Sequence, residues 1–188
     1  MRKVWLPCDE EVYFSLYRVD EYYGVVVFTR LGLYEITLPS ASSKDEVLAT
    51  LHKHYTRPVG ENDLARDVAK KLIRYFSGEM VDFDDLLDTR GNTAFQNQVY
   101  WAVRTIRYGE VKTYGEIARV IHRPKAARGV GSAMARNALP IIIPCHRVIG
   151  SSGAMTGYSA PGGTERKLTL LRMEAEVLEK HKGIKAMK

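Results

Sequence analysis

The sequence predicts a chain of two parts, an α/β part with a small antiparallel sheet followed by a mainly helical part with a helix-turn-helix. Runs rich in β-branched and aromatic residues come first and give way to helical periodicities. The composition then changes from acidic to basic near residue 90. Since 188 residues suffice for one large domain or two small ones, we place a domain boundary there, giving domains 1–90 and 91–188.

The first part begins with three expected strands, at 12–14, 24–28 and 33–38, separated by Gly24 and Gly32. This spacing predicts an antiparallel meander. A polar break with Ser43 as a cap then predicts a helix from about 44 to 55. A second helix is expected at 64–76, where apolar residues recur on one face.

The segment 79–88 carries five acidic residues, which raises the question of a metal site. It lacks the glycine and the spacing of a calcium-binding loop, so we expect a solvated connector. The two cysteines, Cys8 and Cys145, belong to no Cys-x-x-Cys pattern and no His-x₃-His pair accompanies them. We therefore expect no metal site.

The second part begins with an expected helix at 93–107. Thr113 and Glu116 form a capping box for a short helix to about 121, and Pro124 separates it from a helix at 126–136. That last helix alternates small residues with Arg128 and Arg136. The pattern is typical of a helix-turn-helix, although close helix packing also explains small residues. A final amphipathic helix is expected at 165–182, with apolar anchors at Leu168, Leu171, Val177 and Leu178.

The positive charge is concentrated in the second part. Residues 101–150 include nine basic but only two acidic residues, and no acid occurs between Glu116 and Glu165. A run of charge is often only a solvated face. A window this long predicts a polyanionic partner, and nucleic acid is the leading candidate because phosphate neutralisation supplies most non-specific affinity.

The stretch 141–150, Ile-Ile-Ile-Pro-Cys-His-Arg-Val-Ile-Gly, places Cys145 beside a histidine and after an apolar run. We expect a buried strand at 141–143 that ends at Pro144. On these residues alone, an inert buried cysteine and a reactive thiol are both open, because cysteine is among the most buried residue types.

Several motifs of the second part resemble the O6-alkylguanine-DNA alkyltransferase family, also called methylated-DNA–protein-cysteine methyltransferases. They are Phe95-Gln96, Tyr108-Gly109-Glu110-Val111, 113–118, Arg128-x-Val130-Gly131, Asn137, 144–148 and Gly157-Tyr158-Ser159. The chain departs from the family pattern at Arg107 and Ala138, where proline is usual, and in a longer segment at 160–163. The resemblance implies an RNase H-like first domain and a winged-helix-like second domain.

The resemblance also implies roles for individual residues. Cys145 would attack the alkyl group, with His146 taking its proton through a water, since neighbours on a strand face opposite ways. Glu174 would orient the imidazole, and Asn137 would tie the turn to the cysteine segment. The pocket would be lined by Met134, Val148, Gly157, Tyr158 and Ser159, with the Tyr158 hydroxyl or the Ser159 N–H assisting the leaving base.

Chemistry on a base inside a duplex requires base flipping. By resemblance, Tyr114 would crowd the phosphate of the target, and Arg128 would fill the vacancy in the stack. Small residues would let the helix approach the minor groove closely; they are Ala127, Gly131 and Ala135.

The implied activity is DNA repair by transfer of an alkyl group from O6-alkylguanine to Cys145, once per molecule and with no cofactor. We expect a monomer that binds double-stranded DNA, without a membrane segment, in the cytoplasm and on the nucleoid when bound. A non-catalytic sensor of alkylated DNA is the alternative from another class. A cysteine hydrolase is disfavoured, because such enzymes keep cysteine and histidine apart in sequence.

Overall fold

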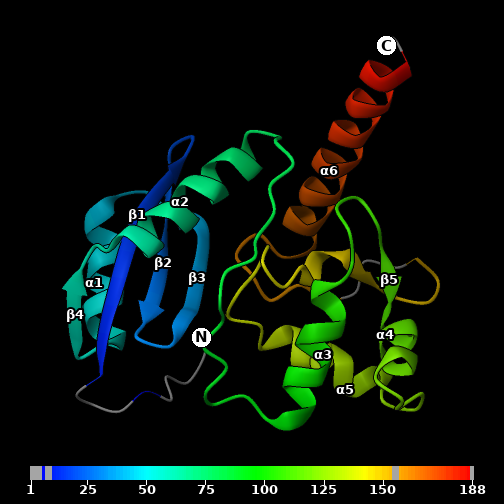
Figure 1. The fold of residues 1–188 in the computed structure, drawn as a ribbon, viewed down its shortest axis with the longest axis horizontal. Coiled ribbons are helices and arrows are strands. Elements are labelled where there is room, and N and C mark those ends of the chain that lie inside the picture. The colour runs from blue at the N-terminus through cyan, green and yellow to red at the C-terminus, as the bar shows by residue number, and fades with distance from the viewer. Residues whose placement is uncertain (1–5, 7–9, 154–156, 187–188) are drawn as a thin grey trace. The chain divides into compact units, whose positions relative to one another are not determined.

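The computed structural model describes residues 6, 10–153 and 157–186, with side chains described as far as residue 182. Contacts divide the chain into two compact units, Met1–Asn92 and Thr93–Lys188. Figure 1 gives the course of the chain, and each unit is described by itself. Cys8 lies outside the described residues. Within the described part of the chain, no helix is both long and apolar enough to cross a bilayer.

The N-terminal unit contains a four-stranded sheet in the order β3-β2-β1-β4. Strands β1 (Glu11–Val19), β2 (Tyr22–Thr29) and β3 (Gly32–Ala41) pair antiparallel, which confirms the predicted meander. Strand β4 (Arg57–Gly60) pairs parallel to β1 and was not predicted. Its four residues include a proline and a glycine, which are tolerated because β4 is an edge strand.

Gly24 lies within β2, so it does not mark a turn between strands as expected. The Tyr17 ring of β1 crosses it, and the Tyr17 hydroxyl donates to the Thr37 carbonyl at 2.9 Å. A Cβ atom at Gly24 would lie 2.5 Å from the Thr37 carbonyl oxygen and 2.7 Å from the Tyr17 ring. The glycine is therefore required by this close approach.

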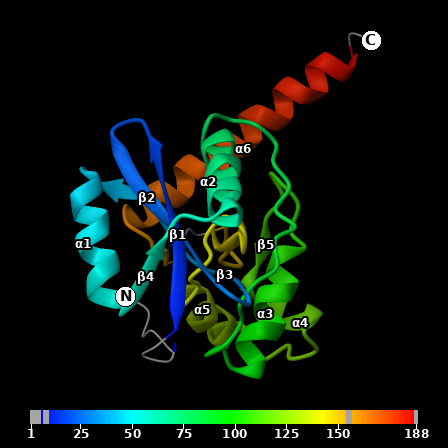
Figure 2. The same ribbon diagram turned by 60° about the vertical axis from the view of Figure 1, so that its left-hand side comes forward.

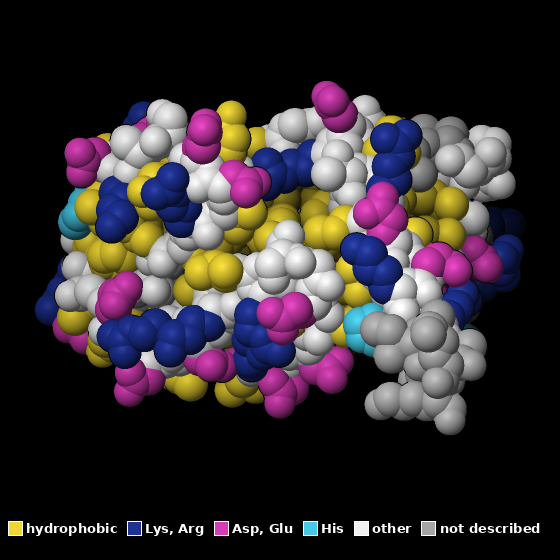
Figure 3. Space-filling model, turned by 90° about the horizontal axis from the view of Figure 1, so that it is seen from above, with side chains coloured by type: hydrophobic (Ala, Val, Ile, Leu, Met, Phe, Trp, Pro, Cys, Tyr) yellow, Lys and Arg dark blue, Asp and Glu magenta, His cyan; other side chains and the backbone are white. Residues whose placement is uncertain are grey.

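Two helices cover the sheet on opposite sides, as the two views in Figures 1 and 2 show. Helix α1 (Lys44–His54) begins at the predicted Ser43 cap and shares a core with Val25 and Val27 of β2. Helix α2 (Asp63–Phe76) packs on β1 and β2. On the left of Figure 3, acidic and basic side chains are interleaved, so this surface has no large patch of a single charge sign.

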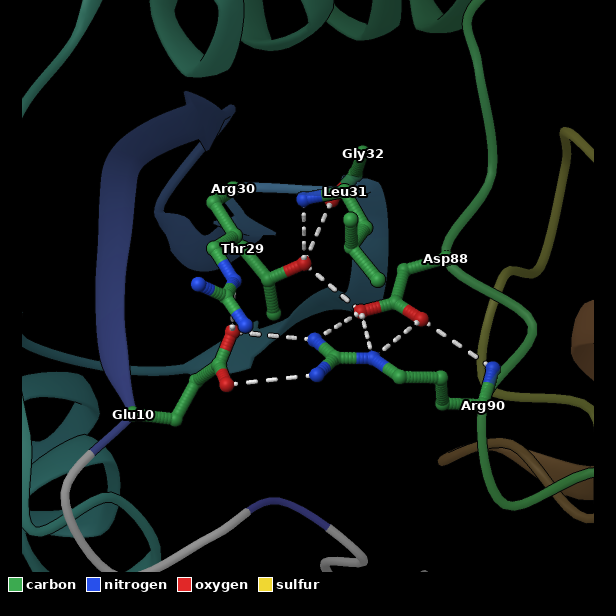
Figure 4. A network of polar contacts seen from close by, with 7 residues as sticks. All are labelled: Glu10, Thr29, Arg30, Leu31, Gly32, Asp88 and Arg90. Carbon is green, nitrogen blue, oxygen red and sulfur yellow. Dashed lines mark hydrogen bonds and ion pairs between the residues drawn. The ribbon is translucent and has the colours of Figure 1, made fainter.

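The acidic connector is only partly solvated, in contrast to the expectation. Asp88 is 2% exposed because residues 86–88 add to the edge of β3. The Leu33 N–H donates to the Leu86 carbonyl at 2.8 Å, and the Asp88 N–H donates to the Leu33 carbonyl at 2.9 Å. Figure 4 shows the Asp88 carboxylate between the Thr29 hydroxyl (2.6 Å) and the Arg90 guanidinium, which also reaches Glu10 at 2.9 Å.

The C-terminal unit is mainly helical. Its helices are α3 (Ala94–Arg104), α4 (Tyr114–Val120), α5 (Ala127–Ala135) and α6 (Gly163–Ala186). A short parallel pair joins β5 (Lys112–Thr113) to β6 (Val148–Ile149). The capping box of Thr113 and Glu116 is confirmed, and Thr93 and Gln96 form a second box that we did not predict. Helices α4 and α5, joined by a short turn, occupy the place of the predicted helix-turn-helix.

The predicted strand at 141–143 is wrong. Ile141 has φ +74°, and the Ile143 N–H donates to the Leu139 carbonyl at 2.8 Å, so this segment is a tight turn. Cys145–Arg147 follows as one turn of 3₁₀ helix. The cysteine and histidine are therefore not strand neighbours. A β-branched residue at positive φ is strained, which indicates that the surrounding contacts hold the turn in place.

Candidate active site

Cys145 opens onto a pocket of about 690 Å³ in the C-terminal unit. Helices α4 and α5, the 3₁₀ turn and the loop before α6 supply its walls. The lining residues are Tyr114, Gly115, Ala127, Arg128, Gly131, Met134, Ala135, Cys145, Gly150, Ser151, Gly157, Tyr158 and Ser159. Every predicted binding residue is among them except Val148. Gly115 of α4 and the loop residues Gly150 and Ser151 were missed, because small residues carry no signal of their own.

Val148 is placed differently from the expectation. It is fully buried in β6 beside Lys112 of β5, and it is not among the residues that line the pocket. Its carbonyl accepts a hydrogen bond from Lys167 Nζ at 2.5 Å. Val148 thus belongs to the packing around the cysteine segment.

Some small residues of α5 line the pocket, and another allows close packing against the Phe95 ring. Ala127, Gly131 and Ala135 recur every fourth residue and face the pocket together with the exposed Arg128. A Cβ at Gly131 would meet the Tyr114 ring only at 3.8 Å, an ordinary contact. Packing therefore does not require glycine at this position. At Gly129, by contrast, a Cβ would lie 3.1 Å from the Phe95 ring, so there the packing explanation holds.

Asn137 ties together the turn that precedes the cysteine. Its Nδ2 donates to the Ile143 carbonyl at 2.8 Å, and its Oδ1 accepts from the Leu139 N–H at 3.0 Å. The first bond spans the strained Ile141 and fixes the end of the turn two residues before Cys145, and the second holds the start of the turn. This is the connection that the sequence predicted for Asn137.

His146 and Glu174 form a buried pair. His146 Nε2 lies 2.9 Å from Glu174 Oε1, and both residues are 0% exposed. Burial raises the pKa of Glu174, but hydrogen bonds from His146 and Arg147 outweigh it and hold the pKa well below its usual range. Burial lowers the pKa of His146 despite the nearby carboxylate. A neutral imidazole next to an ionised carboxylate carries its proton on Nε2, which leaves Nδ1 as the acceptor.

Arg147 completes this cluster, and sequence reasoning missed its role. We counted it in the basic window, but it is 8% exposed. Its guanidinium donates to Glu174 through Nε (2.9 Å) and Nη2 (2.8 Å), and through Nη1 to the Ile106 carbonyl at 2.8 Å. It also lies over the Tyr108 ring, 5.4 Å from the centroid. Burial raises the pKa of Tyr108 to about 12.

Gly109 supplies a further donor to the carboxylate. Its N–H donates to Glu174 Oε2 at 3.0 Å, and its φ is +73°. A Cβ here would lie 2.1 Å from Leu178 Cδ1. Glycine is needed both for the backbone conformation and for the approach of α6.

The surroundings of the Cys145 thiol shift its pKa in opposite directions. The residue is 8% exposed, and burial raises the pKa of its thiol. A hydrogen bond from the Asn137 side chain, the charge of Lys167, and the backbone N–H groups of Cys145 and His146 act in the opposite direction. Because only the thiolate is a strong nucleophile, these groups are the ones that favour reactivity. Among the described residues, no cluster of three potential metal ligands occurs.

Comparisons with known proteins find relatives of this chain in one family. Residues 94–176 match the model of the 6-O-methylguanine DNA methyltransferase DNA-binding domain. A methylated-DNA–protein-cysteine methyltransferase of Shigella flexneri is 35% identical over 178 residues, 93% of this chain and 91% of that protein. One from Mycolicibacterium paratuberculosis is 52% identical over 105 residues, which cover 56% of this chain and 62% of that relative.

Solved structures show the same likeness. A Mycobacterium tuberculosis OGT in complex with DNA has a TM-score of 0.71 and 37% identity, covering 88% of this chain and 94% of that one. An O6-methylguanine-DNA methyltransferase of Pyrococcus kodakaraensis has a TM-score of 0.60 and 25% identity, covering 87% and 98%.

Proposed function

The chain belongs to the methylated-DNA–protein-cysteine methyltransferase family, a family of DNA-repair enzymes, and on this premise we propose how its residues carry out the reaction. We propose that an O6-alkylguanine is flipped out of duplex DNA into the pocket and that its alkyl group moves irreversibly to Cys145. The observation that carries this proposal is the placement of Cys145 at a pocket, directly followed by the buried His146–Glu174 pair.

Helix α5 is proposed to enter the minor groove. The pocket face of the helix carries three small residues, Ala127, Gly131 and Ala135, and Arg128 beside them is exposed. A guanidinium stacks on bases and donates hydrogen bonds, so Arg128 suits the space that the flipped base leaves. Tyr114 of α4 lines the same pocket, and its proposed role is to crowd the target phosphate. The degenerate code of the minor groove suits an enzyme that scans without reading sequence.

The transfer step requires a thiolate. The proton of Cys145 passes through a water to Nδ1 of His146, and Glu174 stabilises the imidazolium that results. The sulfur then forms a bond to the alkyl carbon as the bond from that carbon to O6 breaks. Guanine departs with the electron pair, assisted by the Tyr158 hydroxyl or the Ser159 N–H. His146 finally passes its proton to the departing guanine, which leaves both the guanine and the imidazole neutral.

The product is a thioether, which none of the described residues that line the pocket is equipped to hydrolyse. We therefore propose one turnover per molecule without a cofactor.

We also propose that the protein acts as a monomer in the cytoplasm, on the nucleoid when bound to DNA. The sheet order β3-β2-β1-β4, with β4 parallel to β1, supports an RNase H-like N-terminal unit, and the α4–α5 pair with β5 and β6 supports a winged-helix-like C-terminal unit.

A Cys145→Ser variant separates this proposal from the alternative of a non-catalytic damage sensor. We expect the variant to bind duplex containing O6-methylguanine with unchanged affinity and to transfer no methyl group. Binding is measured by fluorescence anisotropy, and transfer by the loss of O6-methylguanine from the duplex. Loss with neither protein would favour the sensor, and equal loss with both would assign the repair to a group other than Cys145.

A further inference from the structure

Lys167 is a buried ammonium group that the reaction described above leaves without a role. It lies on α6 and is 0% exposed. Its Nζ donates to the Val148 carbonyl at 2.5 Å and lies 6.0 Å from the centroid of the Tyr114 ring. In the described part of the chain, no carboxylate lies within ion-pair distance of this Nζ. The other buried charges are paired, Glu174 with Arg147 and Asp88 with Arg90.

A buried ammonium without a carboxylate is costly, and in most sites it is neutralised or given a counter-ion. One carbonyl and one aromatic face compensate only part of the lost hydration. Burial lowers the pKa of Lys167, and the Cys145 thiol is the one titratable group that acts against this effect. The Cys145 thiol must become negative during the reaction, and as a thiolate it would supply the counter-charge of Lys167.

The geometry agrees with this pairing. Val148, which accepts the Lys167 hydrogen bond, is three residues beyond Cys145, and Tyr114 lines the same pocket as the thiol. The ammonium is therefore held beside the cysteine segment and under a wall of the pocket. The charged and titratable groups around the thiol are Lys167 and Glu174 from α6, and His146 and Arg147, which follow Cys145 in the chain.

We propose that Lys167 is a positioning residue whose fixed positive charge stabilises the Cys145 thiolate during alkyl transfer. This inference rests on the proposed function and deepens it. His146 receives the proton of the thiol. Lys167 keeps its own protons, and its positive charge lowers the free energy of the thiolate in this buried site. In a low-dielectric environment such a charge acts strongly on its neighbour.

A purely structural role is the competing explanation, since Lys167 also ties α6 to β6. Two variants separate the roles. Lys167→Met keeps most of the aliphatic stem but removes both charge and donor, and Lys167→Gln removes the charge but keeps an N–H donor. Lys180→Met is the matched control, because Lys180 is exposed on the same helix and its loss changes the net charge equally.

The test measures the rate at which iodoacetamide alkylates Cys145 as a function of pH, read by mass spectrometry of the Cys145 peptide. This small electrophile needs neither DNA nor base flipping, and the Cys8 peptide of the same digest is an internal reference. For both Lys167 variants we expect the midpoint of the profile to rise by about one pH unit or more, with a roughly tenfold slower reaction at neutral pH. Lys180→Met and the Cys8 peptide should show no shift.

Unchanged profiles in both Lys167 variants would overturn the proposal, and so would a shift in Lys167→Met alone, which would assign the effect to the hydrogen bond. A reciprocal measurement applies if neither variant folds. By linkage, Cys145→Ser should lower the ammonium pKa of Lys167, measured by NMR of the lysine Nζ, and an unchanged pKa would contradict the coupling. A shifted iodoacetamide profile without methyl transfer from DNA by the wild type would retain the role of Lys167 and reject the proposed function.

Discussion

Replacing Glu174 by glutamine preserves the shape of a buried side chain while removing its charge. The carboxylate accepts from His146 Nε2, from Arg147 Nε and Nη2, and from the Gly109 N–H, and it is 0% exposed. A glutamine amide presents an NH₂ group to some of these donors and leaves the Arg147 charge without a counter-ion. Removing one partner of a buried ion pair costs about 3–5 kcal/mol, a large part of a typical total stability.

The pH dependence of this loss has a definite sign. The folded pKa of Glu174 lies below its ordinary value of 4.5, so the carboxylate contributes stability that is fully present above that value. The contribution is lost as the pH falls through the folded pKa. The difference in unfolding free energy between the wild type and Glu174→Gln should therefore be constant near neutral pH and shrink in acid.

The assay is urea denaturation followed by tryptophan fluorescence in a Trp5→Phe background, which leaves Trp101 of α3 as the only tryptophan. Glu176→Gln is the control, because Glu176 is exposed on the same helix, and its effect should stay within about 0.5 kcal/mol. We also expect methyl transfer by Glu174→Gln to slow by about 10²- to 10³-fold, since the imidazolium loses its partner. Equal stability of the two variants would refute the reasoning.

Three further predictions follow from the contacts. Arg90→Met should destabilise the N-terminal unit by about 2–3 kcal/mol in urea titrations, less than for a fully buried pair because the Arg90 side chain is 32% exposed. Its effect should fade in acid, where Asp88 becomes protonated, and a pH-independent effect would contradict the ion-pair origin. Gly109→Ala should cost about 1–3 kcal/mol through the Leu178 clash and the positive φ, and adding Leu178→Ala should recover only the steric part. Arg128→Ala should slow transfer from duplex DNA far more than transfer from free O6-methylguanine, and equal slowing would exclude a role in flipping.

The helices with clear periodicity could be predicted from the sequence because each has one buried face, and the meander could be predicted from runs of β-branched and aromatic residues, although β2 is buried on both faces. Strand β4 could not, since its four residues gain their place only from pairing with β1. The apolar run at 141–143 also misled us. Its burial was right, but the hydrogen bonds of Asn137 to the turn, not local preference, determine its backbone.

The residues around the cysteine show the same limit. Cys145, His146 and Glu174 were expected from the motif, whereas the buried roles of Arg147 and Lys167 were not. A signal existed on α6, where the buried residues Lys167, Leu170, Glu174 and Val177 recur at helical spacing. We had placed the apolar face at Leu168, Leu171, Val177 and Leu178, because a charged residue is not expected on a core stripe. The partners that permit such burial lie on other elements, and only the fold brings them together.

The measurement that tests the central claim most directly is mass spectrometry of the protein after incubation with a duplex that contains O6-methylguanine. We predict that each molecule gains one methyl group, that the group lies on the Cys145 peptide, and that repaired guanine appears in equal amount. An unmodified Cys145 accompanied by repair, or more repaired guanine than protein, would contradict the transfer mechanism.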